Sequence, residues 1–405
     1  IAAWWFDAHQ WNVFVSRSEN VCRIRCNPTP SLFCSPVGKL DHMTSQLALH
    51  HRECGVATVS ECATPVPAND EVVVKVAAVC LNPIDWKILY GAKSSAPTIL
   101  GCDLAGTVAS IGDEVTAIEV GDRVIGFTAG GNPLRPNDGA FAQYVAVPAH
   151  VVLHIPHDMS FESGATLPTP IFVSGFSLYR NLSVPYPSLP SEAVSSTPTT
   201  DDESRSKSIL IYGGGTSNGL MQIQLAKLSG LLVYTVCSRA SHELVKQCGA
   251  DHIFYHDAPS TLEDLRIATQ GKIQIAVDCI ATEQSAAICA SNMEVSGGKY
   301  ISFTGARIRD RRITTVNIFG FTMLNIEFLF EAIGIRADIN VEDVTFATDF
   351  ARRAERLIAR NAIKPSAAEV RPGGLDGIVS GLEDMKAGRV RGRRLVYVVD
   401  QPNKR

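Results

Sequence analysis

The sequence SILIYGGGTSNG, residues 208–219, joins an apolar run to a glycine-rich turn. The run over residues 208–212 is typical of a buried β-strand, and a helical pattern follows the turn to about Leu228. Such glycines let the backbone approach a pyrophosphate, whose negative charge is favoured at the N-terminus of the following helix. The last glycine of a G-x-G-x-x-G motif falls one place late, at Gly219, so a purely structural turn is the alternative.

Beyond this turn, apolar strand-like segments alternate with helical patterns. The alternation predicts an α/β fold in which residues 171–334 form a doubly wound parallel sheet of the Rossmann type. The expected strands after the glycine turn are residues 231–236, 253–255, 273–278 and 299–303, and the expected helices are residues 241–248 and 262–269.

The chain before residue 170 has a different pattern. Short β-branched runs at residues 71–80 and 141–147 are separated by glycine turns, which predicts a compact, barrel-like β-rich domain. Residues 162–182 show helical spacing broken by prolines. Near the end of the chain, an amphipathic stretch over residues 347–360 precedes a strand over residues 394–399.

Two segments show no periodic pattern. Residues 183–207 are rich in Pro, Ser, Thr and acidic residues, and we expect a flexible loop there. Residues 1–45 begin with Ile1, and the first methionine is Met43. We interpret this stretch as a disordered leader or an artefact of gene modelling, with a targeting segment as the alternative.

The bulk composition narrows the class of protein. The 405 residues are 45% apolar and 19% charged, with a net charge of −4. This length predicts two or three domains, and the charge argues against nucleic-acid binding. The sequence has no run of about 18 apolar residues, so we expect no membrane-spanning helix. The 11 cysteines are scattered without C-x-x-C spacing, which is typical of reduced thiols and indicates a cytoplasmic protein.

The end of the second Rossmann strand indicates which cofactor binds. An NAD site carries an acidic residue there for the ribose hydroxyls, whereas this chain reads VCSRAS over residues 236–241. Ser238 and Arg239 suit a 2′-phosphate, because a guanidinium matches phosphate geometry. The sequence therefore predicts NADPH. Tyr255 and His256 would flank the same phosphate, although a lone histidine is also typical of a plain surface residue.

Several motifs together resemble the medium-chain dehydrogenase/reductase superfamily. GDRV at residues 121–124 and GAFAQY at residues 139–144 accompany the Rossmann half. More narrowly, NPIDWK at residues 82–87, GCDLAG at residues 101–106 and DCI at residues 278–280 resemble the trans-acting enoyl reductases of fungal polyketide gene clusters. The resemblance runs from about residue 46 to the end. It implies a GroES-like catalytic domain made of residues 46–170 and 335–405, with the active site in a cleft beside the Rossmann domain.

The resemblance also implies that the metal sites of zinc alcohol dehydrogenases are absent. Asn82, Cys102 and Thr169 stand where those enzymes have their three catalytic-zinc ligands, and residues 133–138 offer no cysteine for a structural zinc. We therefore expect no metal, and a hydride transfer that proceeds without a Lewis acid. Reduction of a C=C bond conjugated to a carbonyl fits this requirement.

Lys87 is the expected catalytic residue. The resemblance places it against the cofactor, where its charge would position NADPH or stabilise a developing enolate, and a solvated surface lysine is the alternative. The dipeptide Asn82-Pro83 predicts a turn, and Asp85 is expected to order this turn rather than donate a proton. The sequence identifies no general acid; Tyr90 and Tyr144 are weak candidates.

The remaining contacts are carried over from the family residue by residue. Those expected to bind the cofactor are Ile84, Asp85, Trp86, Lys87, Gly215, Thr216, Ser217, Asn218, Ser238, Arg239, Ala240, Ser241, Tyr255, His256, Phe303, Thr304, Val390 and Arg391. Those expected to line the substrate cleft are Asp138, Gly139, Ala140, Phe141, Ala142, Gln143, Tyr144, Val145, Ile318, Phe319, Gly320, Phe321 and Thr322.

The function implied by the resemblance is NADPH-dependent reduction of an α,β-unsaturated acyl thioester in secondary metabolism. The acyl chain would be tethered to the carrier domain of a polyketide synthase, and the enzyme is expected to be a monomer. Two alternatives stay open: a stand-alone zinc-free quinone or enone reductase, and a non-catalytic NADPH-binding partner of a synthase.

Overall fold

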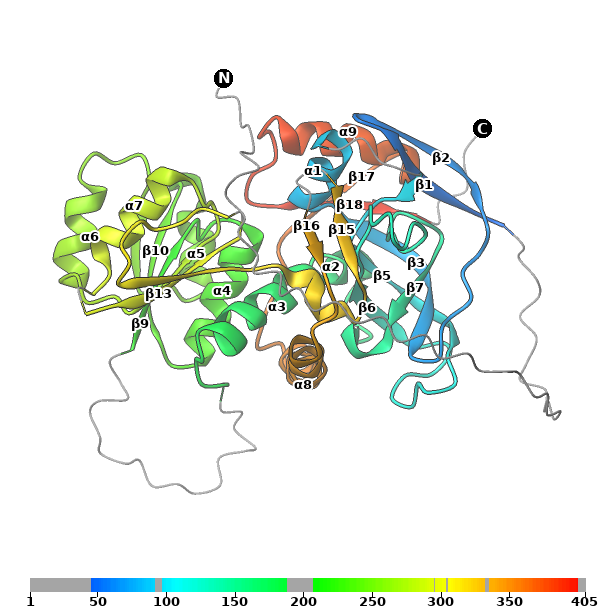
Figure 1. The fold of residues 1–405 in the computed structure, drawn as a ribbon, viewed down its shortest axis with the longest axis horizontal. Coiled ribbons are helices and arrows are strands. Elements are labelled where there is room, and N and C mark those ends of the chain that lie inside the picture. Colours follow the sequence, from blue (N-terminus) through cyan, green and yellow to red (C-terminus); the bar gives the residue numbers. More distant parts are fainter. Residues whose placement is uncertain are drawn as a thin grey trace, which may run out of the picture.

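The computed structural model describes residues 45–91, 97–187, 207–294, 296–303, 305–331 and 335–399. Most of the expected leader, most of the expected loop over residues 183–207, and the expected cofactor contact Thr304 lie outside these ranges. The described chain forms two bodies that lie side by side, with the Rossmann-type sheet on the left of Figure 1 and the β-rich domain on the right.

The predicted Rossmann-type sheet is confirmed. Its six strands have the order β11-β10-β9-β12-β13-β14, and every neighbouring pair is parallel. The last strand was not expected from the sequence. The strands are β9 (Ser208–Tyr212), β10 (Leu232–Cys237), β11 (His252–Tyr255), β12 (Ile275–Asp278), β13 (Gly298–Ser302) and β14 (Ile313–Asn317), and the helices are α4 (Ser217–Leu228), α5 (His242–Gln247), α6 (Thr261–Thr269) and α7 (Glu283–Asn292).

The predicted β-rich domain is confirmed as well. A seven-stranded sheet has the order β17-β18-β3-β5-β6-β8, with β7 also paired to β3, and a three-stranded sheet has the order β2-β1-β4. The C-terminal strand β18 (Arg394–Val398) pairs antiparallel with β3 (Glu71–Cys80), so the end of the chain returns to the first domain. The other strands are β1 (Gln46–Glu53), β2 (Val56–Cys62), β4 (Thr98–Ile99), β5 (Asp103–Ile111), β6 (Arg123–Phe127), β7 (Tyr144–Pro148), β8 (Val152–His154) and β17 (Ala368–Arg371).

Helix α1 (Pro83–Gly91) stands where the sequence predicted only a turn. Proline is tolerated at the first helical position because that N–H has no partner within the helix. The Asp85 carboxylate also accepts a hydrogen bond from the Asn82 N–H at 2.7 Å, as the third residue of a capping box does. Asn82 and Asp85 in NPIDWK thus have the spacing of a helix N-terminal capping box, but the dipeptide Asn-Pro is also a common turn signal. The remaining helices are α2 (Phe161–Gly164), α3 (Pro168–Gly175), α8 (Val341–Ala359) and α9 (Gly374–Lys386), with short turns η2 (Ala149–Val151), η3 (Phe176–Asn181), η4 (Arg239–Ser241) and η5 (Gly320–Leu324).

The chain leaves the Rossmann-type sheet earlier than the predicted boundary at residue 334. The last strand of that sheet ends at Asn317, and a hairpin of β15 (Phe328–Phe330) and β16 (Ile335–Ala337) follows. Asn132 of the β-rich domain holds this hairpin: its Nδ2 donates to the Glu327 carbonyl at 2.8 Å, and its Oδ1 accepts from the Leu329 N–H at 3.2 Å. Asn132 lies almost 200 residues before the hairpin in the sequence, and hydropathy patterns do not reveal such a polar contact.

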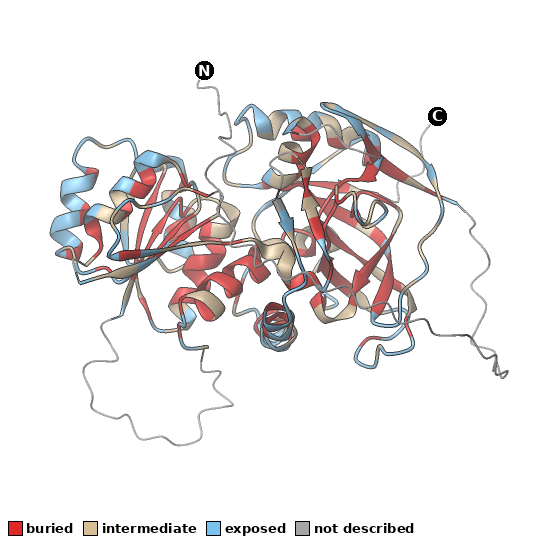
Figure 2. Ribbon diagram, in the orientation of Figure 1, coloured by how far each residue is buried: buried red, intermediate tan, exposed pale blue. Residues whose placement is uncertain are grey.

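Helix α3 joins the two bodies. It lies between them in Figure 1, and Figure 2 shows it buried along its length. The Phe172 ring lies 5.0 Å from that of Phe127 in β6 and 6.1 Å from that of Phe350 in α8. Gly175 must be glycine, because an added Cβ would come within 2.2 Å of the Phe350 ring. No helix in the described ranges is long and apolar enough to cross a membrane.

His154, at the end of β8, fastens helix α8 to the β-rich domain. Its Nε2 lies 2.9 Å from Asp122 Oδ2, and its Nδ1 lies 3.2 Å from Glu355 Oε1. The hydrogen bond to Glu355, together with the one to Asp122, raises the pKa of His154 to about 9. Two carboxylates therefore hold the imidazole in its charged form at neutral pH.

We predict a pH-dependent contribution of His154 to stability. Because its pKa in the folded state is raised, the contribution is present in full below the ordinary pKa of 6.5 and is lost as the pH rises through about 9. Urea unfolding of the wild type and of His154→Gln should show a free-energy difference that shrinks from about pH 6 to about pH 10. A difference that stays constant over this range would contradict the assignment.

Candidate active site

A buried ion pair lies beneath the junction of the two domains. Arg394 Nη2 is 2.9 Å from Asp103 Oδ2, and the two side chains are 4% and 0% exposed. A lone ion in such a place would cost several kcal/mol of desolvation, so each charge needs a full set of partners. The two residues are 291 positions apart in the sequence, and all six strands of the Rossmann-type sheet lie between β5 and β18, which carry them.

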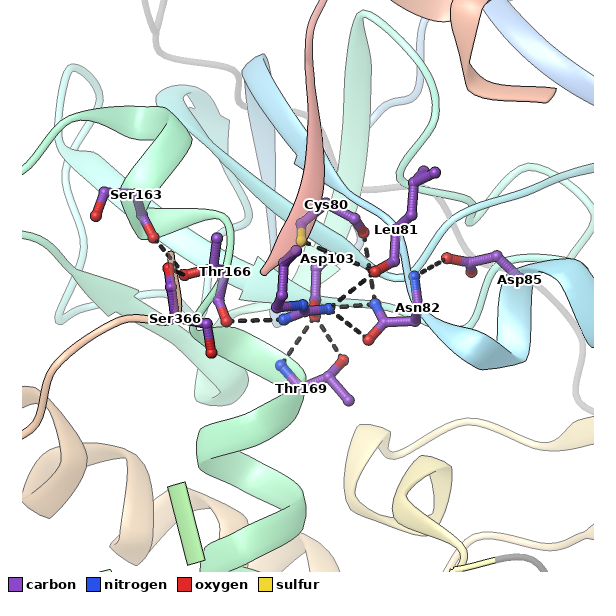
Figure 3. A network of polar contacts seen from close by, with 10 residues as sticks. Cys80, Leu81, Asn82, Asp85, Asp103, Ser163, Thr166, Thr169 and Ser366 are labelled. Atoms are coloured by element: carbon purple, nitrogen blue, oxygen red, sulfur yellow. Dashed lines mark hydrogen bonds and ion pairs between the residues drawn. The ribbon is translucent and has the colours of Figure 1, made fainter. Parts of the chain in front are cut away.

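Each charge of this pair has polar partners (Figure 3). Asp103 Oδ1 accepts from the Thr169 N–H at 2.9 Å and from the Thr169 hydroxyl at 2.5 Å. Asp103 Oδ2 also accepts from Asn82 Nδ2 at 3.0 Å. Arg394 donates to Asn82 Oδ1 at 2.6 Å and to the Thr166 carbonyl at 2.7 Å. The pair is therefore hydrogen-bonded on every side.

This network includes Asn82 and Thr169, two of the three positions at which the family resemblance placed the catalytic-zinc ligands of zinc alcohol dehydrogenases. Asn82 and Thr169 bind the Asp103 carboxylate, and the guanidinium of Arg394 supplies the positive charge among them. Within the part of the chain that the structure describes, no group of three or more His, Cys, Asp and Glu side chains is arranged to hold a metal ion.

Two helices extend from the network toward the predicted site. Helix α1 begins directly after Asn82 and carries Lys87 on its second turn, and helix α3 begins at Pro168, next to Thr169. Ser174, five residues after Thr169 and about 7.5 Å farther along the axis, contacts the Asn218 carbonyl at the start of α4 at 3.5 Å. The lysine and the glycine-rich turn are thus both fixed to the same buried ion pair.

Lys87 is partly buried, which does not fit the alternative of a solvated surface lysine. Burial lowers the pKa of its ammonium group, and its Nζ lies 5.9 Å from the centroid of the Trp86 ring. The neighbouring Ile84 and Trp86 are also partly exposed and pack against the main core. Residues 84, 86 and 87 therefore present a mixed apolar and cationic surface.

Asp85 points inward. It is 1% exposed, and burial raises the pKa of its carboxyl to about 7, with the negative charge of Asp103 as a further cause. One of its oxygens accepts the Asn82 N–H, as expected for a residue that orders the turn. Its other oxygen, Oδ1, is buried, and a hydrogen bond with the Cys102 thiol partly offsets the rise in the pKa of the carboxyl. With so little exposed surface, the side chain of Asp85 is not placed to bind cofactor directly.

The glycine-rich turn has the geometry of an anion cradle. The Thr216 hydroxyl caps α4 by accepting the Gly219 N–H at 3.0 Å. An added Cβ at Gly215 would lie 2.3 Å from Ser241 Oγ, and one at Gly219 would lie 2.3 Å from the Gly213 carbonyl. Residues 215–218 are partly exposed at the N-terminus of α4. Close packing therefore explains the late Gly219, and a pyrophosphate fits this turn.

The residues expected at the 2′-phosphate gather at the carboxyl ends of β10 and β11. Ser238 and Ser241 hydrogen-bond to each other at 3.0 Å, and Ala240 is exposed beside them. The guanidinium of Arg239 lies 4.6 Å from the centroid of the Tyr255 ring, whose hydroxyl is bonded to His242 at 2.9 Å. Hydroxyl, guanidinium and aromatic groups at one edge suit a phosphorylated ribose.

Sequence reasoning missed Asp257 at this edge. Its Oδ1 lies 3.5 Å from Arg239 Nε. Asp257 and His256, whose side chain is exposed, also line a cavity of about 450 Å³ between α6 and α7, together with Thr261, Gln284 and Ile288. The motif of NAD sites predicts an acidic residue only at the end of the second strand, whereas Asp257 follows the third. The segment after β11 could have indicated this residue, because β11 is the parallel neighbour of β10 and its carboxyl end meets the same edge of the sheet.

The loop before β18, which carries the expected cofactor contacts Val390 and Arg391, reaches the Rossmann-type domain. Val390 packs against the main core, and an added Cβ at Gly392 would lie 3.3 Å from Leu244 in α5. Arg391 is exposed in this loop, and its Nε donates to the Gly388 carbonyl at 3.4 Å. The loop therefore ends beside the helix that follows the Ser238–Ser241 turn.

The expected substrate stretch over residues 138–145 lies largely inside the β-rich domain. Phe141 packs against Gly101, because a Cβ added to Gly101 would lie 2.2 Å from the Phe141 ring. Ala142 forms an isolated antiparallel β-bridge with Ala48 in β1. This corrects the expectation for the buried members, which have no surface for a substrate: Gly139, Ala140, Phe141, Ala142 and Val145. Asp138, Gln143 and Tyr144 are partly exposed, and burial raises the pKa of the Asp138 carboxyl to about 6.

The second expected substrate segment forms an aromatic cluster against α3. Phe319 and Phe321 lie 5.5 and 4.4 Å, centroid to centroid, from Phe328, and both are partly exposed. In the same segment Ile318 is buried, Gly320 lies against Val173 of α3, and the Thr322 hydroxyl donates to Asp343 at 2.7 Å. Phe303, at the end of β13, is partly buried against the main core.

Comparison with known proteins identifies the family. The sequence model described as alcohol dehydrogenase GroES-like domain matches residues 68–157, and the one described as zinc-binding dehydrogenase matches residues 219–328. The chain is 35% identical over 362 residues to trans-enoyl reductase ACTTS2 of Alternaria alternata, covering 88% of this chain and 100% of that protein. It is 34% identical to trans-enoyl reductase fsa3 of a Fusarium species, covering 85% and 96%.

Solved structures agree on the fold. An alcohol dehydrogenase superfamily protein from Novosphingobium aromaticivorans superposes with a TM-score of 0.70 at 23% identity, covering 88% of this chain and 100% of that one. The CurK enoyl reductase superposes with a TM-score of 0.67 at 16% identity, covering 87% and 99%. The chain therefore belongs to the medium-chain dehydrogenase/reductase superfamily, in the group that contains the fungal trans-enoyl reductases. This family implies a nicotinamide cofactor, NAD(P)H.

We predict that Arg394→Met destabilises the protein by about 3–5 kcal/mol, because it leaves the Asp103 carboxylate buried without its counter-charge. The double variant Asp103→Leu/Arg394→Met removes both charges and should lose less stability than Arg394→Met alone. Urea unfolding of the wild type, the two single variants and the double variant gives the coupling energy. Additive losses would contradict a direct pairing of the two charges.

Proposed function

We propose that this protein is a trans-acting enoyl reductase that uses NADPH to reduce the C=C bond of an α,β-unsaturated acyl thioester. The acyl chain would be presented by the carrier domain of a polyketide synthase. Near full-length similarity to trans-enoyl reductases carries this proposal. The chemistry is supported by Lys87, a partly buried cation on a helix that is anchored to the ion pair.

Binding of the cofactor is assigned to the Rossmann-type edge. The helix N-terminus after Gly215 would hold the pyrophosphate, while Ser238 and Arg239 would take the 2′-phosphate. When bound, the cofactor supplies a hydride from C4 of its nicotinamide ring. The loop around Val390 would cover it from the β-rich domain, because that loop already lies beside α5.

Lys87 would act on the substrate oxygen. Addition of hydride at the β-carbon moves negative charge to the thioester carbonyl, and a nearby ammonium group stabilises that charge. The site around Lys87 is partly dehydrated, which strengthens this attraction. The partly exposed phenylalanines 319 and 321 would receive the apolar acyl chain.

We predict that Lys87→Ala lowers kcat/KM for a crotonyl thioester on the order of 10²-fold while the Kd for NADP⁺ changes little. NADPH consumption followed at 340 nm measures turnover. The matched control is Lys386→Ala: Lys386 is an exposed lysine at the end of α9, and its ammonium group lies over the ring of Tyr90 in α1. Unchanged kinetics for Lys87→Ala would assign this lysine a role outside the chemistry.

We predict that Arg239→Asp weakens binding of NADPH more than binding of NADH, by about tenfold or more in the ratio of the two Kd values. The reason is that a carboxylate repels the 2′-phosphate that only NADPH carries. Fluorescence titration of both cofactors gives the ratio. Equal loss for the two cofactors would contradict the assignment of the phosphate to this residue.

The form of the substrate separates the proposal from a stand-alone enone or quinone reductase. Carrier-bound enoyl thioesters should give a higher kcat/KM than free enones and quinones, because docking of the carrier adds binding energy that a free substrate lacks. Equal rates would favour the stand-alone enzyme. Absence of NADPH oxidation with every enone and thioester would favour a non-catalytic partner of a synthase.

A further inference from the structure

We infer that Asp257 sets cofactor selectivity, by competing with the 2′-phosphate of NADPH for Arg239. The inference rests on the proposed function, because it takes the carboxyl edge of β10 and β11 as the site of the adenosine ribose. It adds a residue that neither the glycine-rich motif nor the family contacts include. Its effect opposes that of Arg239: the arginine favours the phosphorylated cofactor, and the aspartate weakens that preference.

The strand register brings the two side chains together. Cys237, the last residue of β10, pairs with Tyr255, the last residue of β11, in a parallel arrangement. Arg239 and Asp257 each lie two residues beyond those ends, so they occupy equivalent positions on neighbouring strands. The separation of 3.5 Å between Arg239 Nε and Asp257 Oδ1 follows from this register.

Both side chains are free to exchange partners. They are 63% and 51% exposed, and an ion pair in such surroundings contributes little to stability. The Tyr255 ring, 4.6 Å from the guanidinium, holds Arg239 over the edge whether or not the aspartate contacts it. A phosphate can therefore displace Asp257 from Arg239, but the carboxylate stays close enough to repel it.

The two cofactors differ at the atom that Asp257 would meet. NADPH brings a phosphate with nearly two negative charges, which a neighbouring carboxylate repels across solvent. NADH brings a 2′-hydroxyl, which can donate a hydrogen bond to a carboxylate, as it does to the acidic residue of NAD sites. The presence of Asp257 should therefore lower the preference for NADPH that Arg239 and Ser238 create.

Substitution of the aspartate by its amide isolates the charge. Asp257→Asn should tighten NADP⁺ binding by about three- to tenfold and leave NAD⁺ binding unchanged or weaker. The gain should shrink as salt is raised from about 0.05 to about 0.5 M, because the interaction is partly screened. Adenosine 2′,5′-bisphosphate should gain affinity by a similar factor, since it carries the phosphate without the nicotinamide half.

The matched control is Asp338→Asn. Asp338 forms a pair of the same kind, with Oδ1 3.5 Å from Arg336 Nε, and its side chain is 83% exposed. It follows β16, which pairs with β15 beside the β-rich domain rather than with the Rossmann-type sheet. This variant removes the same charge from the whole protein, so it should bind both cofactors as the wild type does.

Isothermal titration calorimetry of the full chain with NADP⁺, NAD⁺ and adenosine 2′,5′-bisphosphate tests the inference directly, without an activity assay. A higher NADP⁺ to NAD⁺ preference in Asp257→Asn, absent from Asp338→Asn, supports it. An unchanged preference, or weaker NADP⁺ binding that would make Asp257 a support for Arg239, overturns the inference and leaves the proposed function standing. Failure of the wild type to bind either cofactor overturns both.

Discussion

The buried pair of Arg394 and Asp103 is the constraint on which the rest of the site depends. It joins the C-terminal strand β18 to strand β5, and its hydrogen bonds reach the starts of the two helices that lead into the site, α1 and α3. One charged network thus fixes Lys87 through α1 and the glycine-rich turn through α3 and Ser174. A buried charge pair costs desolvation energy and needs a full set of partners, so its geometry tolerates little variation.

The same network explains the chemistry we propose. At two of the three positions where the family resemblance placed zinc ligands, the side chains of Asn82 and Thr169 instead bind the Asp103 carboxylate. The positive charge beside them belongs to the Arg394 guanidinium, which donates hydrogen bonds to several partners. Charge that develops on a substrate oxygen must then be stabilised from elsewhere, and Lys87 is the cation that the anchored helix α1 carries. When a hydride adds to a conjugated C=C bond, the negative charge collects on one carbonyl oxygen, and a single nearby cation can stabilise it.

The sequence predicted the parallel sheet well, because apolar strands of four to six residues alternate with glycine turns and amphipathic helices. The structure brings Ser238, Arg239 and Tyr255 to one edge of this sheet, since the carboxyl ends of neighbouring parallel strands meet there, and their role in binding the cofactor stays a prediction. Sequence reasoning missed helix α1, because Asn82-Pro83 is a common turn signal, and it missed the pair of Arg394 with Asp103, because contacts between distant residues leave no local pattern. Phe141 and its neighbours were assigned to the substrate by resemblance, whereas packing under Gly101 places them in the core.

We propose that this protein delivers a hydride to the C=C bond of an acyl thioester. The most direct measurement uses NADPH deuterated at C4 on the transferred side, with a crotonyl thioester as substrate, and locates the deuterium in the product by NMR and mass spectrometry. We expect one deuterium at the β-carbon of a saturated thioester and a solvent proton at the α-carbon. Deuterium at the carbonyl carbon of a reduced product, or a saturated thioester without deuterium, would contradict it.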